Sequence, residues 1–272
     1  MKRRRFLLYL AIFLMVLASS GVARADTYLV YNQWGGTWSD VNKTYNGDSN
    51  MCWAASASNI LFWAGYDTAT LNTATLIYQY FVAHWSNYGC YPQYAWSWFL
   101  NGTLPPNYSG MSQVVVPGGN FWPMVNFSSL YQQATSGNLM ASVASDFHSG
   151  DGVSLIIANS YGGEHCLTCW GYDYTILSGG GIQYNNVYVT DSDDFVTALQ
   201  EYPVSWDSTN DVWDLGGTYA GCYISEIEAL GLNSDPPEVP LPPSLLFFIT
   251  GLLALALGRR RGRDYPGASQ GK

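Results

Sequence analysis

Asn50-Met-Cys-Trp-Ala-Ala-Ser-Ala-Ser-Asn-Ile-Leu-Phe-Trp-Ala-Gly65 has the pattern of a packed helix, and the predicted architecture is built outward from it. Apolar residues recur at the spacing of one helical face, at Trp53, Ala57, Ile60, Leu61 and Ala64. Asn50 is expected to cap the start of the helix and Gly65 to end it. Cys52 would then lie in the first turn, where the helix dipole favours the thiolate and lowers the thiol pKa below about 8.5.

A histidine with a suitable setting for partnering Cys52 follows later in the chain. His165 begins an aromatic, strand-like run after a buried strand predicted at Val153–Ala158. A glycine-rich turn, Ser178–Gly181, leads to a strand at Asn186–Thr190 and then to Asp191. Hairpin pairing of the two strands would bring the Asp191 carboxylate to the His165 imidazole.

The order Cys, His, Asp on one helix and two neighbouring strands is that of papain-like proteases. We therefore predict an α+β, papain-like cysteine peptidase fold, with the nucleophile helix packed on an antiparallel sheet that carries His and Asp. The other histidines lack this setting: His84 ends a helix predicted over Thr68–Trp85, and His148 stands beside Gly150 in a predicted loop.

Charge is distributed very unevenly along the chain. Acidic residues number 20 against 11 Lys and Arg, and between Asp26 and Gly258 the one Lys or Arg is Lys43, shortly before Cys52. A domain this acidic is disfavoured as a partner of nucleic acid or of anionic membrane surfaces, because both need basic patches. Lys43 is either a surviving surface lysine or a cation retained for the site.

Four blocks of sequence, in this order, resemble the IdeS/Mac family of secreted streptococcal cysteine peptidases. They are Lys43-Thr-Tyr-Asn-Gly47, the Cys52 helix, His165 with Trp170-Gly-Tyr-Asp173, and Tyr188-Val-Thr-Asp-Ser-Asp193. The resemblance implies a papain-like fold and peptide-bond hydrolysis without a cofactor. It also implies the roles of the site residues: Cys52 as nucleophile, His165 as base, Asp191 as the orienting acid, Lys43 at the oxyanion hole, and Asp193 as a second functional acid.

The chemistry fits these residue types. A Cys52 thiolate would attack a peptide carbonyl, and His165 would protonate the leaving amine. Lys43 and the Cys52 backbone N–H would face the developing oxyanion, where one donor is typically worth ~3 kcal/mol. Asp193 is expected to hold Lys43 in place. A calcium site or a hydrogen-bonded turn at Asp191–Asp194 is the alternative interpretation of that acidic run.

The five cysteines are Cys52, Cys90, Cys166, Cys169 and Cys222, an odd number that leaves at least one thiol unpaired. Cys166 and Cys169 form a CxxC, but in a strand residues three apart point to opposite faces. We therefore expect neither a metal nor a cofactor at this motif. Buried thiols, or pairing with Cys90 or Cys222, are the predicted states.

The two ends of the chain have the features of targeting signals. Residues 1–25 have the basic, apolar and small-residue regions of a secretory signal peptide, with cleavage expected before Asp26. Residues 26–232 form the predicted peptidase domain, 233–243 a Pro-rich linker, and 244–272 an apolar helix with a basic tail. Val239-Pro-Leu-Pro242, the apolar helix and Arg259–Arg261 together resemble the PEP-CTERM sorting signal of Gram-negative bacteria. That resemblance implies transient membrane insertion, an exosortase-type partner, and a secreted or cell-surface location; a permanent anchor is the alternative.

The predicted activity is thus an exported cysteine endopeptidase acting on a protein or peptide substrate. Two other classes stay open: an acyltransferase or amidase of the transglutaminase kind with the same triad, and a non-catalytic surface or biofilm-matrix protein. Whether water or an amine accepts the acyl group from the cysteine depends on the shape of the cleft, which the sequence does not reveal.

Overall fold

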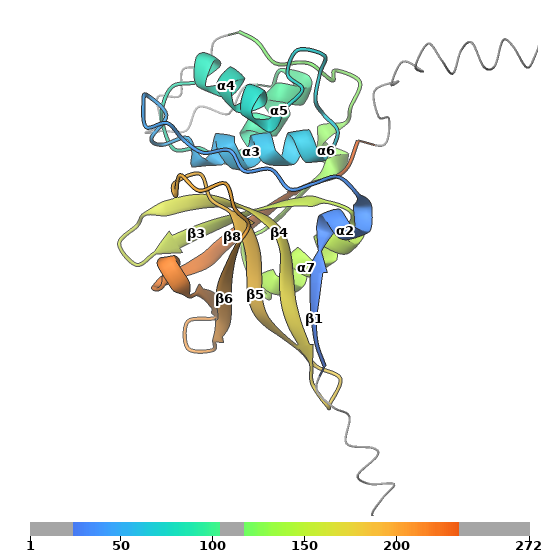
Figure 1. The fold of residues 1–272 in the computed structure, drawn as a ribbon, viewed down its shortest axis with the longest axis vertical. Coiled ribbons are helices and arrows are strands. Elements are labelled where there is room, and N and C mark those ends of the chain that lie inside the picture. Colours follow the sequence, from blue (N-terminus) through green and yellow to red (C-terminus); the bar gives the residue numbers. More distant parts are fainter. Residues whose placement is uncertain (1–23, 104–116, 234–272) are drawn as a thin grey trace, which may run out of the picture. The chain divides into compact units, whose positions relative to one another are not determined.

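The computed structural model describes residues 24–103 and 117–233 of the 272-residue chain (Figure 1). Its helices are α2 (Val30–Trp34), α3 (Cys52–Trp63), α4 (Ala74–His84), α5 (Pro92–Asn101), α6 (Phe127–Leu130) and α7 (Leu139–Ser149), with a 3-10 turn η1 (Gly217–Tyr219). Its strands are β1 (Arg24–Leu29), β2 (Tyr131–Ala134), β3 (Gly152–Asn159), β4 (Glu164–Ile176), β5 (Ile182–Thr190), β6 (Gln200–Asp207), β7 (Val212–Leu215) and β8 (Cys222–Leu230).

Six of these strands close into an antiparallel barrel. The order is β4-β3-β8-β7-β6-β5, and β5 pairs back with β4 from Thr168↔Thr190 to Ile176↔Ile182. Strand β4 makes closure possible because it has 13 residues and is paired along both sides. Strands β1 and β2 lie outside the ring and pair with β4 and β8.

The predicted fold class is therefore wrong. We expected an α+β, papain-like arrangement in which a helix packs on an antiparallel sheet, and the sheet instead closes on itself. The predicted β4–β5 hairpin is present. Its glycine-rich turn indicates that these two strands pair with each other, but it does not indicate which strands pair along the other side of β4 or of β5. Closure depends on β6, β7 and β8, whose pairing links segments that local sequence patterns do not connect.

Helix α3 packs between the barrel and the other helices. In Figure 1 it lies between the strands and the pair α4 and α5. Ser56 Oγ donates to Leu167 O of β4 at 3.3 Å, and Asn59 Nδ2 donates to Thr168 Oγ1 at 3.0 Å. On the opposite side Trp53 packs against Phe81, their rings 6.1 Å apart. Because both faces are buried, the small residues of α3 serve close packing, and its first residue is fixed relative to β4.

Several local predictions need correction. Met51, not Asn50, is the N-cap of α3, and it makes no side-chain capping bond. Helix α4 begins at Ala74 rather than Thr68, because Thr73 caps it by accepting from Leu76 N. His148 lies in the last turn of α7, not in a loop, because that helix continues to Ser149 and ends at the left-handed Gly150.

The described residues reach slightly beyond the predicted domain at both ends. Strand β1 begins at Arg24, two residues before the expected cleavage point, and Asn233 N donates to Ala64 O at 2.8 Å. Nearly all of the predicted signal peptide, most of the linker and the sorting helix lie outside the described residues. Within the described ranges, no helix has the length and apolar character needed to cross a bilayer.

Candidate functional site

Cys52 is the first residue of α3, at the positive end of the helix dipole. Its side chain is partly exposed, whereas nearly all the rest of α3 is buried. The neighbouring Met51 and Trp53 are fully buried and hold this end of the helix in the core. The sequence thus places a thiol at the surface of a rigid element, which is the setting that a nucleophile requires.

His165 lies one residue into β4 and is oriented by Asp191, which directly follows β5. His165 Nε2 is 2.8 Å from Asp191 Oδ1, which leaves Nδ1 as the ring nitrogen that faces Cys52. The other Asp191 oxygen accepts from Tyr219 OH at 2.5 Å, and the Tyr219 ring stacks on the imidazole at 5.7 Å. Asp193 N donates to Asp191 Oδ1 at 3.0 Å. Asp191 is 3% exposed, so the charge of its carboxylate acts on His165 with little screening.

The pKa values of Cys52 and His165 move in opposite directions. A hydrogen bond with Cys166 is the largest influence on the pKa of Cys52; burial opposes it, but contact with His165 adds to it, and the pKa falls well below its usual value. Burial alone would lower the pKa of His165, yet hydrogen bonds with Asp191 and Cys52 raise it to about 10. The favoured state at neutral pH is therefore a thiolate facing an imidazolium.

Lys43 is buried beside this group. Its ammonium lies 2.5 Å from Asp193 Oδ1 and donates to Ser49 O at 2.7 Å. Asp193 Oδ2 is 3.8 Å from His165 Nδ1, so one carboxylate connects the lysine to the histidine. The Lys43 side chain is 3% exposed and is not a surface remnant.

The loop before α3 is fixed by its own acid. Asp48 is buried and accepts from Thr44 N at 2.8 Å and Tyr78 OH at 3.0 Å, while its carbonyl accepts from Met51 N. Lys43 N donates to Ser192 O at 2.9 Å, which joins this loop to the Asp191–Asp193 segment. These bonds set the position of Lys43 relative to both α3 and β5.

Two exposed aromatic residues form a contact pair beside the lysine. Tyr45 and Phe195 both have φ near +58°, a left-handed conformation that is uncommon for bulky residues. Their rings lie 5.2 Å apart, and Lys43 Nζ lies 5.1 Å from the Tyr45 ring centroid. The strained backbone thus holds the Tyr45 ring beside the Lys43 ammonium.

All five cysteines are free thiols in the structure. Burial raises the pKa of Cys90 and of Cys169 to about 12. The hydrogen bond with Cys52, followed by burial, raises the pKa of Cys166 well above its usual value. Cys52 is therefore the thiol among these four whose ionisation is favoured.

A candidate metal site is formed by His165, Asp191 and Asp193, which offer ligand atoms within 4.8 Å of one another. The contacts disfavour it. Both oxygens of Asp191 accept hydrogen bonds, and Asp193 pairs with the Lys43 ammonium, which would repel a cation. The predicted alternative of calcium at Asp191–Asp194 thus competes with donors that these acids already have.

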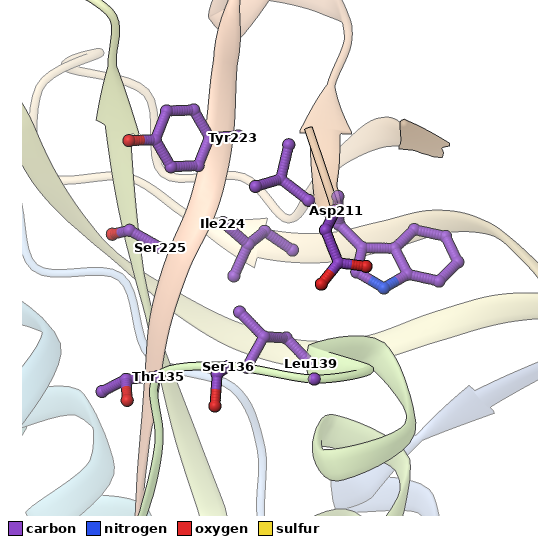
Figure 2. Close-up of a pocket in the computed structure, with 10 residues that line it drawn as sticks. Thr135, Ser136, Leu139, Asp211, Tyr223, Ile224 and Ser225 are labelled. Atoms are coloured by element: carbon purple, nitrogen blue, oxygen red, sulfur yellow. The ribbon is translucent and has the colours of Figure 1, made fainter. Parts of the chain in front are cut away.

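Two cavities are notable among the described residues. One, of about 80 Å³, has Cys52 and His165 in its wall. The other, of about 250 Å³, lies between β7, β8 and the segment before α7. Figure 2 shows that Ile224 points toward Leu139 in this larger cavity, whereas Tyr223 and Ser225 point to the other side of β8. The larger cavity is lined by none of the residues that contact Cys52, so the small one is the candidate site.

Comparison with known proteins adds no assignment: no family model matches the chain, and no curated protein matches it significantly. The resemblance to IdeS/Mac peptidases therefore stays a prediction.

The structure brings Cys52, His165 and Asp191 together, with Lys43 and Asp193 adjoining them. Sequence reasoning missed Tyr219 and the contact of Cys166 with Cys52. Tyr219 is one of 21 tyrosines and lies 28 residues from its partner, so no local pattern identified it. Cys166 directly follows His165, and this adjacency is the sequence signal for its place beside Cys52, whereas the CxxC spacing relates it only to Cys169.

Proposed function

We propose that the protein is an exported cysteine endopeptidase that hydrolyses peptide bonds through Cys52, His165 and Asp191. The observation that carries the proposal is the hydrogen-bonded relay: Asp191 Oδ1 lies 2.8 Å from His165 Nε2, and His165 in turn contacts the Cys52 thiol. The opposite pKa shifts of the thiol and the imidazole are those of an activated nucleophile and its acid.

In the proposed reaction the Cys52 thiolate attacks the substrate carbonyl carbon. The resulting oxyanion is stabilised by the Cys52 backbone N–H at the start of α3 and by the Lys43 ammonium nearby. His165 gives its proton to the leaving amine, and then takes one from water as the thioester is hydrolysed. Asp191 and Tyr219 hold the imidazole in orientation throughout. Export and sorting rest on the terminal sequences alone.

The first test is chemical. Iodoacetamide at a mildly acidic pH should alkylate Cys52 well before the other cysteines, because the fraction of thiolate decides the rate. Peptide mapping by mass spectrometry gives the site. Cys222→Ala should leave this labelling unchanged, whereas His165→Ala should suppress it. Equal labelling of all five cysteines would refute an activated thiol and favour the non-catalytic interpretation.

The second test is turnover. A mixed peptide library in ¹⁸O-water should yield fragments with ¹⁸O in the new carboxyl group, and Cys52→Ala should yield none. Lys43→Ala should retain the fold and lower kcat by roughly 10²-fold. Transfer of the acyl group to an added amine, without ¹⁸O incorporation, would replace hydrolysis by the acyltransferase alternative.

A further inference from the structure

The cavity beside Cys52 opens directly on the sulfur and has a definite chemical character. Its wall is formed by Cys52 and His165 together with residues 89–91, Ile156, Glu164 and Cys166. At about 80 Å³ it is far smaller than the 300–1,000 Å³ typical of sites that enclose a whole ligand. A space of this size beside a nucleophile suits one side chain of a longer substrate.

Glu164 gives this wall its charge. It is the one Asp or Glu in the lining, and it is exposed at the first position of β4, directly before His165. Its Oε2 accepts a hydrogen bond from Tyr91 OH, another lining residue, at 3.2 Å. This bond holds the carboxylate against the cavity without neutralising it.

More acidic groups stand behind the wall. Ile156 of β3 is in register with Cys166 of β4 on one side and with Glu226 of β8 on the other, so the three share a sheet face. Burial, and further the charge of Glu164, raises the pKa of Glu226. Glu228, two residues on, is fully buried and accepts from Gln93 N at 2.8 Å. Burial favours the neutral form of both groups, so the negative charge at the cavity is that of the Glu164 carboxylate.

The chain supplies little positive charge to balance this face. In the ranges 24–103 and 117–233, the only Lys and Arg are Arg24 and Lys43. Arg24 pairs with Asp26 on β1, and Lys43 is buried against Asp193. His165, the cationic group of the lining, faces the Cys52 thiolate. Among the described residues, Glu164 forms no ion pair. A cation that enters the cavity would consequently meet a carboxylate that no Lys, Arg or His already neutralises.

We propose that this cavity is the subsite for a cationic side chain of the substrate, lysine or arginine, and that Glu164 is the residue that selects it. The proposal rests on the peptidase function above and specifies its substrate class. The guanidinium or ammonium would lie against the Glu164 carboxylate while the substrate backbone presents a carbonyl to Cys52. The aliphatic part of the side chain would contact Ile156 and the edge of Tyr91.

Matched peptides test this selection. A quenched fluorescent peptide with arginine at the residue that occupies the cavity should be cleaved at least tenfold more efficiently, as kcat/KM, than the same peptide with citrulline, its neutral isostere. A scan of that pair along the peptide finds the position. Glu164→Gln should abolish the preference by lowering kcat/KM for the arginine peptide. Glu164→Asp should restore part of it, and Glu201→Gln, an exposed strand acid outside the cavity, should retain it in full. Equal cleavage of the two peptides by the wild type, or a preference that survives Glu164→Gln, would overturn the proposal.

A second measurement separates this proposal from the peptidase assignment. Cationic aminoethyl methanethiosulfonate should modify Cys52 at least tenfold faster than the anionic sulfonatoethyl reagent, after correction for their rates with a free thiol. Glu164→Gln should reduce that ratio severalfold and Glu201→Gln should not. If no peptide is cleaved but the ratio behaves in this way, the peptidase function fails and the cation preference stands. Cleavage with no charge preference in either assay leaves the peptidase and removes the cationic subsite.

Discussion

The Lys43–Asp193 pair permits a quantitative prediction, because its partners are buried unequally. Lys43 is 3% exposed, whereas Asp193 is 34% exposed. Asp193→Asn would leave an ammonium inside the protein with Ser49 O and the Tyr45 ring as its neighbours. Removing one partner of a buried pair costs about 3–5 kcal/mol, and solvent access to the Asp193 side reduces this to about 2 kcal/mol.

The reverse change should cost less. Lys43→Met removes the charge and keeps an unbranched apolar stem, and the remaining Asp193 carboxylate can reach water, so we expect a loss of about 1 kcal/mol. The double variant should be about as stable as Lys43→Met alone. Asp193→Asn is costly only because it leaves the Lys43 ammonium buried without its counter-ion, and in the double variant that ammonium is absent. The coupling between the two sites is then about 2 kcal/mol.

Urea unfolding, followed by tryptophan fluorescence at neutral pH, measures all four proteins. Equal m-values would show that the same unfolding reaction is compared. The order of stability should persist in high salt, because a buried pair is screened little. Two single-variant losses that add to within about 0.5 kcal/mol in the double variant would refute the idea that Asp193 stabilises the buried lysine.

Three other substitutions test the site and the core. Asp191→Asn should move the pH midpoint of Cys52 alkylation upward. Loss of the carboxylate lowers the pKa of His165 from about 10 and so removes the imidazolium that favours the thiolate. An unchanged midpoint would contradict the role of Asp191. Burial raises the pKa of Glu228 to about 8, so this group stabilises the fold below its unfolded pKa and loses that contribution as pH rises toward 8. Urea unfolding at pH 5 and pH 8 should accordingly show a smaller difference for Glu228→Gln than for the wild type, while Glu201→Gln leaves the difference unchanged. A Cβ at Gly171 would lie 2.2 Å from Tyr28 O, so Gly171→Ala should cost more than about 2 kcal/mol in thermal or urea unfolding, whereas Gly179→Ala, with open space around it, should cost little.

The local elements around the site were predictable because each has a short-range signal. The apolar spacing after Cys52 identified α3, and the glycine turn between two aromatic runs identified the β4–β5 hairpin. The hairpin in turn placed Asp191 near His165 without knowledge of the rest of the fold. The lone lysine was noticed through charge counting, but its burial against Asp193 was visible only in the structure.

The barrel architecture was not predictable, because it depends on pairing between strands that no local sequence pattern relates. The barrel closes through β6 and β7, two strands whose sequences give no indication of their partners. Tyr219 reaches Asp191 from a short turn after β7, and its role depends on that closure. Asn50 has a good capping side chain but instead uses it to donate to Asn87 O at 3.3 Å, so a tertiary contact overrode the local preference.

The two strands outside the ring cover the long strands β4 and β8, so that the edges of the sheet are short strands of 6 and 4 residues. On one side of β4, β3 pairs with Glu164–Cys169 and β1 continues from Gly171 to Ile176. On one side of β8, β7 pairs with Tyr223 and Ile224, and β2 continues from Ile227 to Leu230. A sheet edge is a template on which another chain can add a strand, and β1 and β2 cover such edges on both long strands. Together with a net charge of −9, which makes copies repel one another, this covering opposes strand-mediated self-association at high local concentration.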